Sequence, residues 1–112
     1  MVRSHIERFK TQLEVRQHEL RMSIEHQQRS ARRAEIEPDV VDGATSNYEK
    51  ESLLRQSNRE QGLLQMVEAA LGRIQGGSFG QCQSCGKEID EKRLQAVPWT
   101  RYCIHCQEDF ER

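Results

Sequence analysis

The sequence predicts a mainly α protein: a long antiparallel helical hairpin, followed by a compact C-terminal module held together by cysteines and ending in a short terminal helix. Three observations predict this fold. Two long stretches are rich in helix-forming residues and are separated by a proline-containing turn. Four cysteines lie in the last third of the chain as two Cys-x-x-Cys pairs. Only 35% of the 112 residues are hydrophobic and 5% aromatic, too few to fill a conventional globular core.

The first helix is expected from Arg3 to about Glu35. This stretch contains no Gly or Pro and is dense in Glu, Gln and Arg, whose long side chains lose little freedom in a helix. Apolar residues recur along it at separations of 7, 7, 4, 7 and 3, which is typical of a face packed in a two-helix coiled coil. Gln17 and Gln27 interrupt this seam. Its members are Ile6, Leu13, Leu20, Ile24, Ala31 and Ala34.

The turn between the two helices begins at Pro38, which breaks the helical pattern. Residues 39–44, Asp-Val-Val-Asp-Gly-Ala, then form the tip of the expected hairpin. Ser46 and Glu49 match a capping box for the second helix, and Asp42 is a competing N-cap.

The second helix is expected to run to about Ile74. Leu64, Val67, Leu71 and Ile74 lie near its end at separations of 3, 4 and 3 and should face the early part of the first seam. The glycines that follow suit a helix C-terminus, because glycine readily adopts left-handed backbone angles. Two antiparallel arms of ~30 residues at ~1.5 Å per residue would make a rod of about 45 Å. We therefore expect a hairpin domain over residues 1–75, with its tip at about 38–46.

The four cysteines predict a zinc site in a second domain, residues 76–112. Cys82 and Cys85 form one pair, Cys103 and Cys106 the other, and the seventeen residues between the pairs give the spacing of a four-cysteine zinc finger. Four thiolates complete the tetrahedron around one Zn²⁺ and leave no position for an activated water, so the metal should be structural. His105 is expected to be a surface residue. Residues 107–112 predict the short terminal helix.

Other uses of the cysteines are less favoured. The N-terminal residues Met-Val-Arg-Ser-His-Ile lack the apolar stretch of a signal peptide, which disfavours disulfides. A thioredoxin-like redox pair would need a βαβ context that is absent. No run of ~18 apolar residues suggests a membrane span, and we expect a reducing, cytoplasmic compartment. The formal net charge of −1 does not favour nonspecific DNA binding.

Two groups of residues resemble the DksA/TraR family. The zinc finger of this family resembles three stretches of the chain. They are residues 77–89, Gly-Ser-Phe-Gly-Gln-Cys-Gln-Ser-Cys-Gly-Lys-Glu-Ile, residues 93–98, Arg-Leu-Gln-Ala-Val-Pro, and residues 103–106, Cys-Ile-His-Cys. Its coiled-coil tip motif is matched by Asp39-x-x-Asp42-x-Ala44, at the expected distance before the first cysteine. The matches cover most of the chain, which resembles DksA more than the shorter TraR-type members.

This resemblance implies a bacterial transcription regulator that binds RNA polymerase directly. The coiled-coil tip would enter the secondary channel and alter open-complex stability, with Asp39, Asp42 and Ala44 acting on the polymerase. Arg59 and Arg93 would be polymerase or nucleotide contacts. Without the resemblance, the two aspartates are more simply interpreted as helix caps or partners of the helix dipole. We expect a monomer that contacts no membrane and binds no specific DNA sequence.

The same resemblance does not favour a response to the alarmone guanosine tetraphosphate. DksA-like members that respond to it have a longer segment before the coiled coil, whereas the first arm here begins almost at Met1. Met66, Val97 and Gln107 also fall where those members are expected to have basic residues. A phosphate-rich ligand needs charge neutralisation, which neutral side chains do not supply. We therefore expect weak or no alarmone enhancement.

Two other functions remain open from the sequence alone. A nucleic-acid-binding zinc module is suggested by Lys87, Lys92, Arg93 and Arg101, but residues 76–112 hold five Lys or Arg against six Asp or Glu. A zinc-stabilised helical adaptor would use the coiled coil to pair with another helical protein. Catalysis is not expected, because the metal is coordinatively closed and no Ser/His/Asp or Cys/His arrangement is evident.

Overall fold

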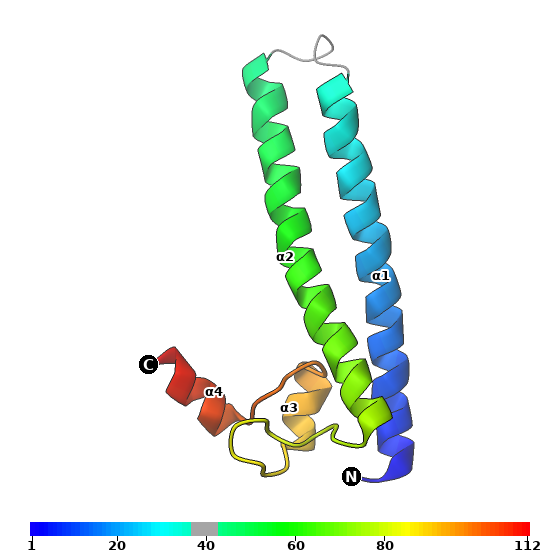
Figure 1. Cartoon of the computed structure of the whole chain (residues 1–112), viewed down its shortest axis with the longest axis vertical. Helices are drawn as coiled ribbons and strands as arrows, with labels where there is room; N and C mark the ends of the chain where they lie inside the picture. Colours follow the sequence, from blue (N-terminus) through cyan, green and yellow to red (C-terminus); the bar gives the residue numbers. More distant parts are fainter. Residues whose placement is uncertain (37–42) are drawn as a thin grey trace. The chain divides into compact units, whose positions relative to one another are not determined.

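The computed structural model describes the backbone of residues 1–36 and 43–112 and the side chains of residues 1–33 and 48–112. In these ranges the helices are α1 (Arg3–Ile36), α2 (Gly43–Gly76), α3 (Glu91–Ala96) and α4 (Ile104–Glu111). The two long helices lie side by side and antiparallel (Figure 1), as the sequence predicts. No helix in these ranges combines the length and apolar character that crossing a membrane requires.

The second long helix begins earlier than the predicted capping box. α2 starts at Gly43, so Ser46 and Glu49 lie inside the helix and the predicted cap at Ser46 is wrong. Serine and glutamate are tolerated within helices as well as at their ends, so this pattern does not by itself fix a helix start. The competing cap, Asp42, lies outside the described residues.

Glycine ends the second helix as expected. Gly77 has a φ of +83°, in the left-handed region that a residue without Cβ adopts at little cost. Its N–H donates to the carbonyl of Ile74 at 3.3 Å, and the N–H of Ser78 donates to the carbonyl of Arg73 at 2.9 Å. These two bonds make a Schellman motif, which satisfies carbonyls left open at the helix end and turns the chain toward the cysteines.

The chain divides into two compact units, and the first of them comprises His18–Leu64. In this unit Leu20, Ile24 and Ala31 of α1 are buried, which confirms these members of the predicted seam. Gln27 interrupts the seam as expected and is itself buried, with its Nε2 donating to Ser23 Oγ at 2.9 Å. The hairpin interface here therefore contains a polar position between apolar ones.

The second unit comprises Met1–Gln17 and Gln65–Arg112, and it joins the first turns of α1 and the last turns of α2 to the cysteine module. Phe9 packs on Phe79 with ring centroids 5.6 Å apart, although Phe9 was not part of the predicted seam. Ile6, which was part of it, is only half-buried. Phe79 comes from outside the hairpin, so the helical repeat alone could not indicate this contact. The buried apolar side chains of the unit are Phe9, Leu13, Val67, Ala70, Phe79, Cys82, Ile89 and Leu94.

Polar contacts also join the long helices to the module. Arg73 of α2 donates through Nη2 to the carbonyls of Trp99 and Thr100, at 3.3 Å in both cases. His5 of α1 shares a hydrogen bond of 2.7 Å with Glu91 of α3, between Nδ1 and Oε1. Because these partners lie far apart in the sequence, they hold the module against both helices at once.

Removing buried apolar volume from α1 should destabilise the protein far more than removing exposed volume nearby. Leu13 is 1% exposed and Val15 is 54% exposed. We expect Leu13→Ala to lower the free energy of unfolding by about 2–5 kcal/mol, because it leaves a cavity. The matched control Val15→Ala should change it by less than about 0.5 kcal/mol. Urea titrations of both variants with zinc present measure this difference, and equal effects would contradict the packing described.

Candidate functional site

The first cysteine pair lies on a tight knuckle between α2 and α3. The N–H of Cys82 donates to the carbonyl of Lys87 at 2.8 Å, and the N–H of Gly86 donates back to the carbonyl of Cys82 at 2.9 Å. Gly86 has a φ of +78°, which a side chain would strain. An isolated antiparallel bridge between Gln81 and Glu88 closes the knuckle. The backbone thus positions this pair without help from a long strand or helix.

The second pair is placed by the start of α4. Cys103 is the residue before this helix, and its carbonyl accepts the N–H of Gln107 at 3.0 Å. Cys106 lies in the first turn. The terminal helix therefore begins at Ile104, earlier than the predicted residue 107, because the second Cys-x-x-Cys forms its first turn.

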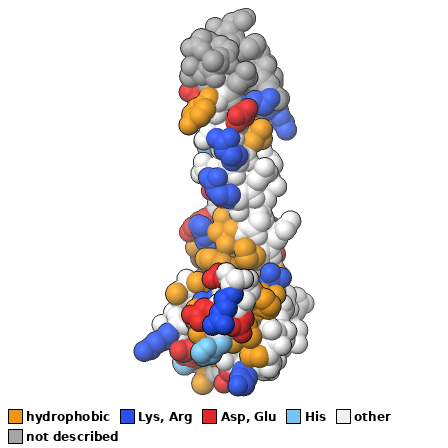
Figure 2. All heavy atoms as spheres, turned by 90° about the vertical axis from the view of Figure 1, so that its left-hand side faces the viewer, with side chains coloured by type: hydrophobic (Ala, Val, Ile, Leu, Met, Phe, Trp, Pro, Cys, Tyr) orange, Lys and Arg blue, Asp and Glu red, His pale blue; other side chains and the backbone are white. Residues whose placement is uncertain are grey.

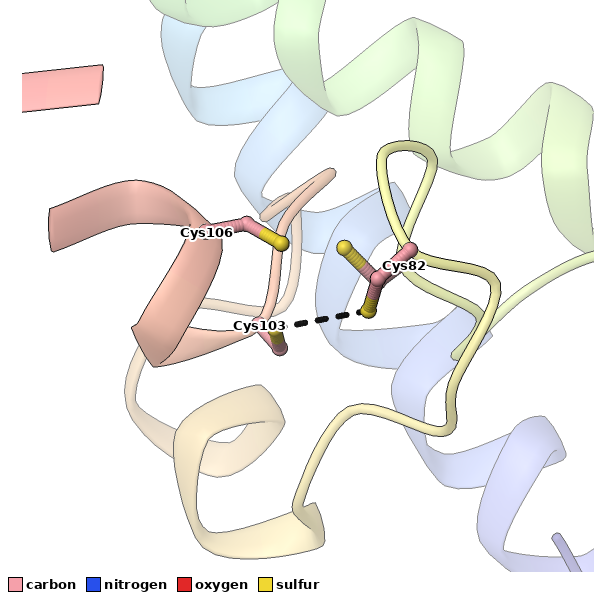
Figure 3. Close-up of side chains that lie close together, drawn as sticks. Cys82, Cys103 and Cys106 are labelled. Carbon is pink, nitrogen blue, oxygen red and sulfur yellow. Dashed lines mark hydrogen bonds between the residues drawn. The ribbon is translucent and has the colours of Figure 1, made fainter. Parts of the chain in front are cut away.

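The four sulfur atoms converge on one point. All of them lie within 4.8 Å of one another, and those of Cys85 and Cys103 are 3.8 Å apart. Tetrahedral zinc with Zn–S bonds of ~2.3 Å separates its sulfurs by about 3.8 Å, so this donor set fits one Zn²⁺. Figure 3 shows the side chains of Cys82, Cys103 and Cys106 turned toward the same space. His105 is exposed and stands outside this cluster, as expected for a surface residue.

The crowded thiols ionise unequally when no metal is bound. Burial raises the pKa of Cys82, but hydrogen bonds from the backbone at Cys85, Cys103 and Ser84 outweigh it and lower this pKa to about 6. For Cys106, a hydrogen bond with Ser84 lowers the pKa, but the neighbouring sulfurs of Cys103, Cys82 and Cys85, together with burial, raise it to about 12. The Cys82 thiol therefore loses its proton readily, whereas the Cys106 thiol keeps its proton because the neighbouring sulfurs disfavour a second negative charge. A bound dication favours ionisation of both, since it neutralises part of the charge that the sulfurs share.

The arrangement suits a structural metal. Four cysteine sulfurs fill the coordination shell of zinc, so neither a water nor a substrate oxygen has a place on the metal. When bound, the ion would cross-link two knuckles that are seventeen residues apart in the sequence. The site can therefore order the module, but it offers no position for metal-assisted hydrolysis.

The predicted tip residues are only partly described. Asp39 and Asp42 lie outside the described residues. Ala44 lies in the first turn of α2, and its side chain is outside the described part. Their action at the tip therefore stays a prediction.

The two predicted arginine contacts belong to different units. Arg59 lies on α2 in the unit His18–Leu64, with its side chain exposed. Arg93 lies on α3 and is half-buried, donating through Nε to the carbonyl of Tyr102 at 3.1 Å and through Nη2 to Thr100 Oγ1 at 3.3 Å. Arg93 thus has a structural role within the module whatever else it contacts.

Three neutral residues singled out in the sequence meet in one place. Met66 of α2, Val97 after α3 and Gln107 of α4 all line a cleft of about 650 Å³, and Arg93 lines it too. They lie far apart in the sequence, so their spacing gave no sign of this convergence. At these three positions the cleft carries no positive charge.

Sequence reasoning missed α3 altogether. Asp90 caps this helix by accepting the N–H of Lys92 at 3.2 Å, and Glu91 lies in its first turn. An aspartate followed by an acidic first turn is a recognised helix-start signal, so the helix could have been found. Its importance is the buried Leu94, which packs inside the module.

Two family models match the chain. The model described as the N-terminal domain of the DnaK suppressor protein DksA matches residues 5–74. The model described as the prokaryotic dksA/traR C4-type zinc finger matches residues 77–112. The second model supports the four-cysteine cluster as a C4-type zinc site and confirms the prediction of one structural zinc ion.

Curated relatives agree with these models. An uncharacterised protein of Aquifex aeolicus is 42% identical over 88 residues, covering 79% of this chain and 61% of that protein. The RNA polymerase-binding transcription factor DksA of Salmonella typhimurium is 34% identical over 111 residues, covering 96% of this chain and 72% of that protein. The protein of the same name from Escherichia coli is 40% identical over 70 residues, covering 62% of this chain and 46% of that protein. The matches thus span from about half to nearly three quarters of the relatives' own length.

A solved structure shows the same fold. Transcription factor DksA2 from Pseudomonas aeruginosa superposes with a TM-score of 0.90 and 31% sequence identity, covering 99% of this chain and 86% of that one. This likeness confirms the predicted fold class, including the helical hairpin and the cysteine module.

Zinc affinity should rise with pH. Without metal, Cys106 keeps its proton through the neutral range because its pKa is about 12, and Cys82 gains one below about pH 6. Zinc must displace these protons, so we expect the association constant to increase by at least about tenfold per pH unit near neutrality and more steeply below pH ~6. Competition with a zinc chelator at several pH values measures this slope.

The variant His105→Ala is the matched control, since it removes a titratable side chain between two ligands without removing a ligand. Its slope should equal that of the native chain. A native affinity that does not change with pH would contradict thiolate coordination.

Proposed function

This chain belongs to the DksA/TraR family, and we propose on that basis that it is a transcription regulator that binds bacterial RNA polymerase directly. The observation that carries the proposal is the similarity over 96% of the chain to a protein named RNA polymerase-binding transcription factor DksA. The expectation that the chain is not an enzyme also follows from this family, whose named relatives here are transcription factors.

We further propose that the hairpin enters the polymerase secondary channel with its connecting segment first. α1 ends at Ile36 and α2 begins at Gly43, so Asp39 and Asp42 belong to the connection between the two long helices. A narrow antiparallel helix pair can carry such a connection to a site that a globular domain cannot enter. Two carboxylates delivered there would meet basic or mobile elements near the polymerase active site.

Regulation would then follow from a difference in the factor's affinity for two states of the promoter complex. A factor that binds one state of the promoter complex better than another shifts the populations of the two states by that difference. In this account Asp39, Asp42 and Ala44 discriminate between the states, whereas Arg59 and Arg93 add contacts that hold the factor on the polymerase. The zinc module keeps the first turns of α1 and the last turns of α2 together during binding.

The two alternative functions receive less support. The zinc module is not a basic surface, since its Lys and Arg are slightly outnumbered by Asp and Glu, and phosphate binding needs an excess of positive charge. A helical adaptor would use the same coiled coil with a different partner. Co-purification with polymerase core enzyme separates the adaptor from the proposed function.

The lifetime of open complexes on a ribosomal-RNA-type promoter tests the proposed mechanism. We expect the native chain to shorten this lifetime and Asp42→Asn to lose most of the effect, because the substitution removes one negative charge from the connecting segment. The matched control is Glu49→Gln, which neutralises an exposed carboxylate on α2 near that segment. It should shorten the lifetime as the native chain does. An effect that Asp42→Asn retains in full would contradict the role given to the connection.

Guanosine tetraphosphate should change this lifetime little beyond the effect of the chain alone. The reason is that Met66, Val97 and Gln107 bring no cation to the cleft they share. Its charged lining residues are two arginines, Arg93 and Arg101, and one carboxylate, Glu111, which together offset few of the negative charges of a tetraphosphate. The comparison is between lifetimes measured with the chain in the presence and absence of the alarmone. Strong synergy would refute this prediction while leaving polymerase binding untouched.

A further inference from the structure

The outer part of the hairpin encloses very little apolar surface. It comprises residues 25–33 of α1 and 48–62 of α2, which lie in one compact unit and are called the outer segment below. Its buried side chains are Gln27, Ala31 and Ser57, two polar groups and a methyl. The unit that contains the zinc module instead buries eight apolar side chains. Since apolar burial is the main force that holds a helix pair closed, the outer segment is weakly closed.

Both buried polar side chains of the outer segment take part in hydrogen bonds within their own helix. Gln27 Nε2 donates to Ser23 Oγ at 2.9 Å on α1, and Gln61 Nε2 donates to Ser57 Oγ at 3.3 Å on α2. Neither bond has to break when the two helices separate. These bonds therefore contribute nothing to the attraction between the helices.

The amide oxygen of Gln27 favours separation of the helices. This Oε1 atom is enclosed, no described residue donates a hydrogen bond to it, and the whole side chain is only 4% exposed. A buried carbonyl oxygen without a donor is less stable than the same oxygen in water. When the helices separate, water can donate to this atom, so opening relieves an unfavourable feature of the closed state.

Glycine weakens α2 where the outer segment ends. Gly62 lies inside this 34-residue helix, and a Cβ at its position would meet no atom within 4 Å. Packing therefore does not require glycine here. Glycine lowers helix stability relative to alanine, because it loses more backbone freedom when the helix forms.

The surface of the outer segment does not compensate for its weak interior. On the face drawn in Figure 2, the part of the hairpin below the grey residues carries mostly polar and charged side chains. Two exposed ion pairs, Arg29 with Glu25 and Arg55 with Glu51, each join residues four apart on a single helix. Such pairs support their own helix slightly and do not hold two helices together.

We propose that the outer segment opens locally in the native protein, with its two helices separating and fraying while the zinc module and the helix turns packed on it stay folded. Helices of this length are marginal in water once they are separated, so their backbone hydrogen bonds open too. The opening is a property of the free chain. Its use rests on the proposed function, because a hairpin whose outer helices can separate can adjust to the channel that it enters.

Amide hydrogen exchange of the zinc-loaded full chain measures this opening without polymerase, under conditions where exchange reports the opening equilibrium. We expect protection factors in the outer segment to be at least about a hundredfold below those of the Leu13 and Val67 amides, which exchange only when the whole fold opens.

Substitutions outside the outer segment separate local from global opening. Leu13→Ala should lower protection at Val67 at least about thirtyfold, since it destabilises the whole fold. It should leave the outer segment unchanged, since local opening breaks no contact of Leu13. Ile89→Val is the milder second variant, at a side chain that is 3% exposed. It should show the same pattern, with a loss of about two- to tenfold at Val67.

Two matched pairs of variants locate the weak points. Gln27→Leu should raise protection in the outer segment about tenfold, because it replaces an unsatisfied amide by an apolar side chain. Gln28→Leu, the same change at an exposed position of the same helix, should not. Gly62→Ala should raise this protection about fivefold. Gly72→Ala, at a position equally free of contacts but in the other unit, should leave it unchanged.

Four results would overturn the proposal. They are protection in the outer segment equal to that of Leu13 and Val67, an equal loss of protection in both regions when Leu13 or Ile89 is substituted, the same response to Gln27→Leu as to Gln28→Leu, and the same response to Gly62→Ala as to Gly72→Ala. Polymerase takes part in none of these measurements. Their failure therefore leaves polymerase binding untouched, and a chain that fails to bind polymerase can still show the opening.

Discussion

Coordination of one zinc ion by four cysteine sulfurs is the interaction on which the rest of this structure depends. The chain is poor in apolar residues, and few of those in its C-terminal module are buried: Phe79, Cys82, Ile89 and Leu94. A structural zinc site contributes on the order of 10 kcal/mol, which such a small core cannot supply. Once the two knuckles are joined, Phe79 is held where it meets Phe9, and the loop after α3 is held where it accepts Arg73. The ends of both long helices are thereby fixed to one base.

The interface between the two long helices contains a buried polar residue among its apolar ones. Leu20 and Ile24 are buried in the hairpin interface, yet Gln27 is buried beside them and bonds to Ser23 of its own helix. Because Ser23 belongs to the same helix, this bond does not depend on how the two helices are aligned, and a buried polar side chain of this kind lowers the stability of the hairpin interface relative to an apolar one.

How much of this could be predicted depended on how local each feature is. The bounds of α1 and the zinc ligands followed from patterns within a few residues, and Gly77 ended α2 for a local steric reason. The start of α2 was placed too late, since Ser46 and Glu49 fit a helix interior as well as a cap. The packing of Phe9 on Phe79 was out of reach, because these residues meet only after the module has folded. The cleft lined by Met66, Val97 and Gln107 was not indicated by their spacing, and only the family resemblance grouped these three residues. The short helix α3 had a signal in Asp90 that was overlooked.

The most direct test of the account is equilibrium binding of the chain to bacterial RNA polymerase core enzyme, with the zinc-loaded protein compared with the same protein after the metal has been removed by chelation. The account predicts that the zinc-loaded chain binds and that removing zinc weakens binding at least about tenfold, because the base that holds both helices is lost. Failure of the zinc-loaded chain to bind would contradict the central claim. Equal binding by both forms would contradict the dependence of the structure on the metal.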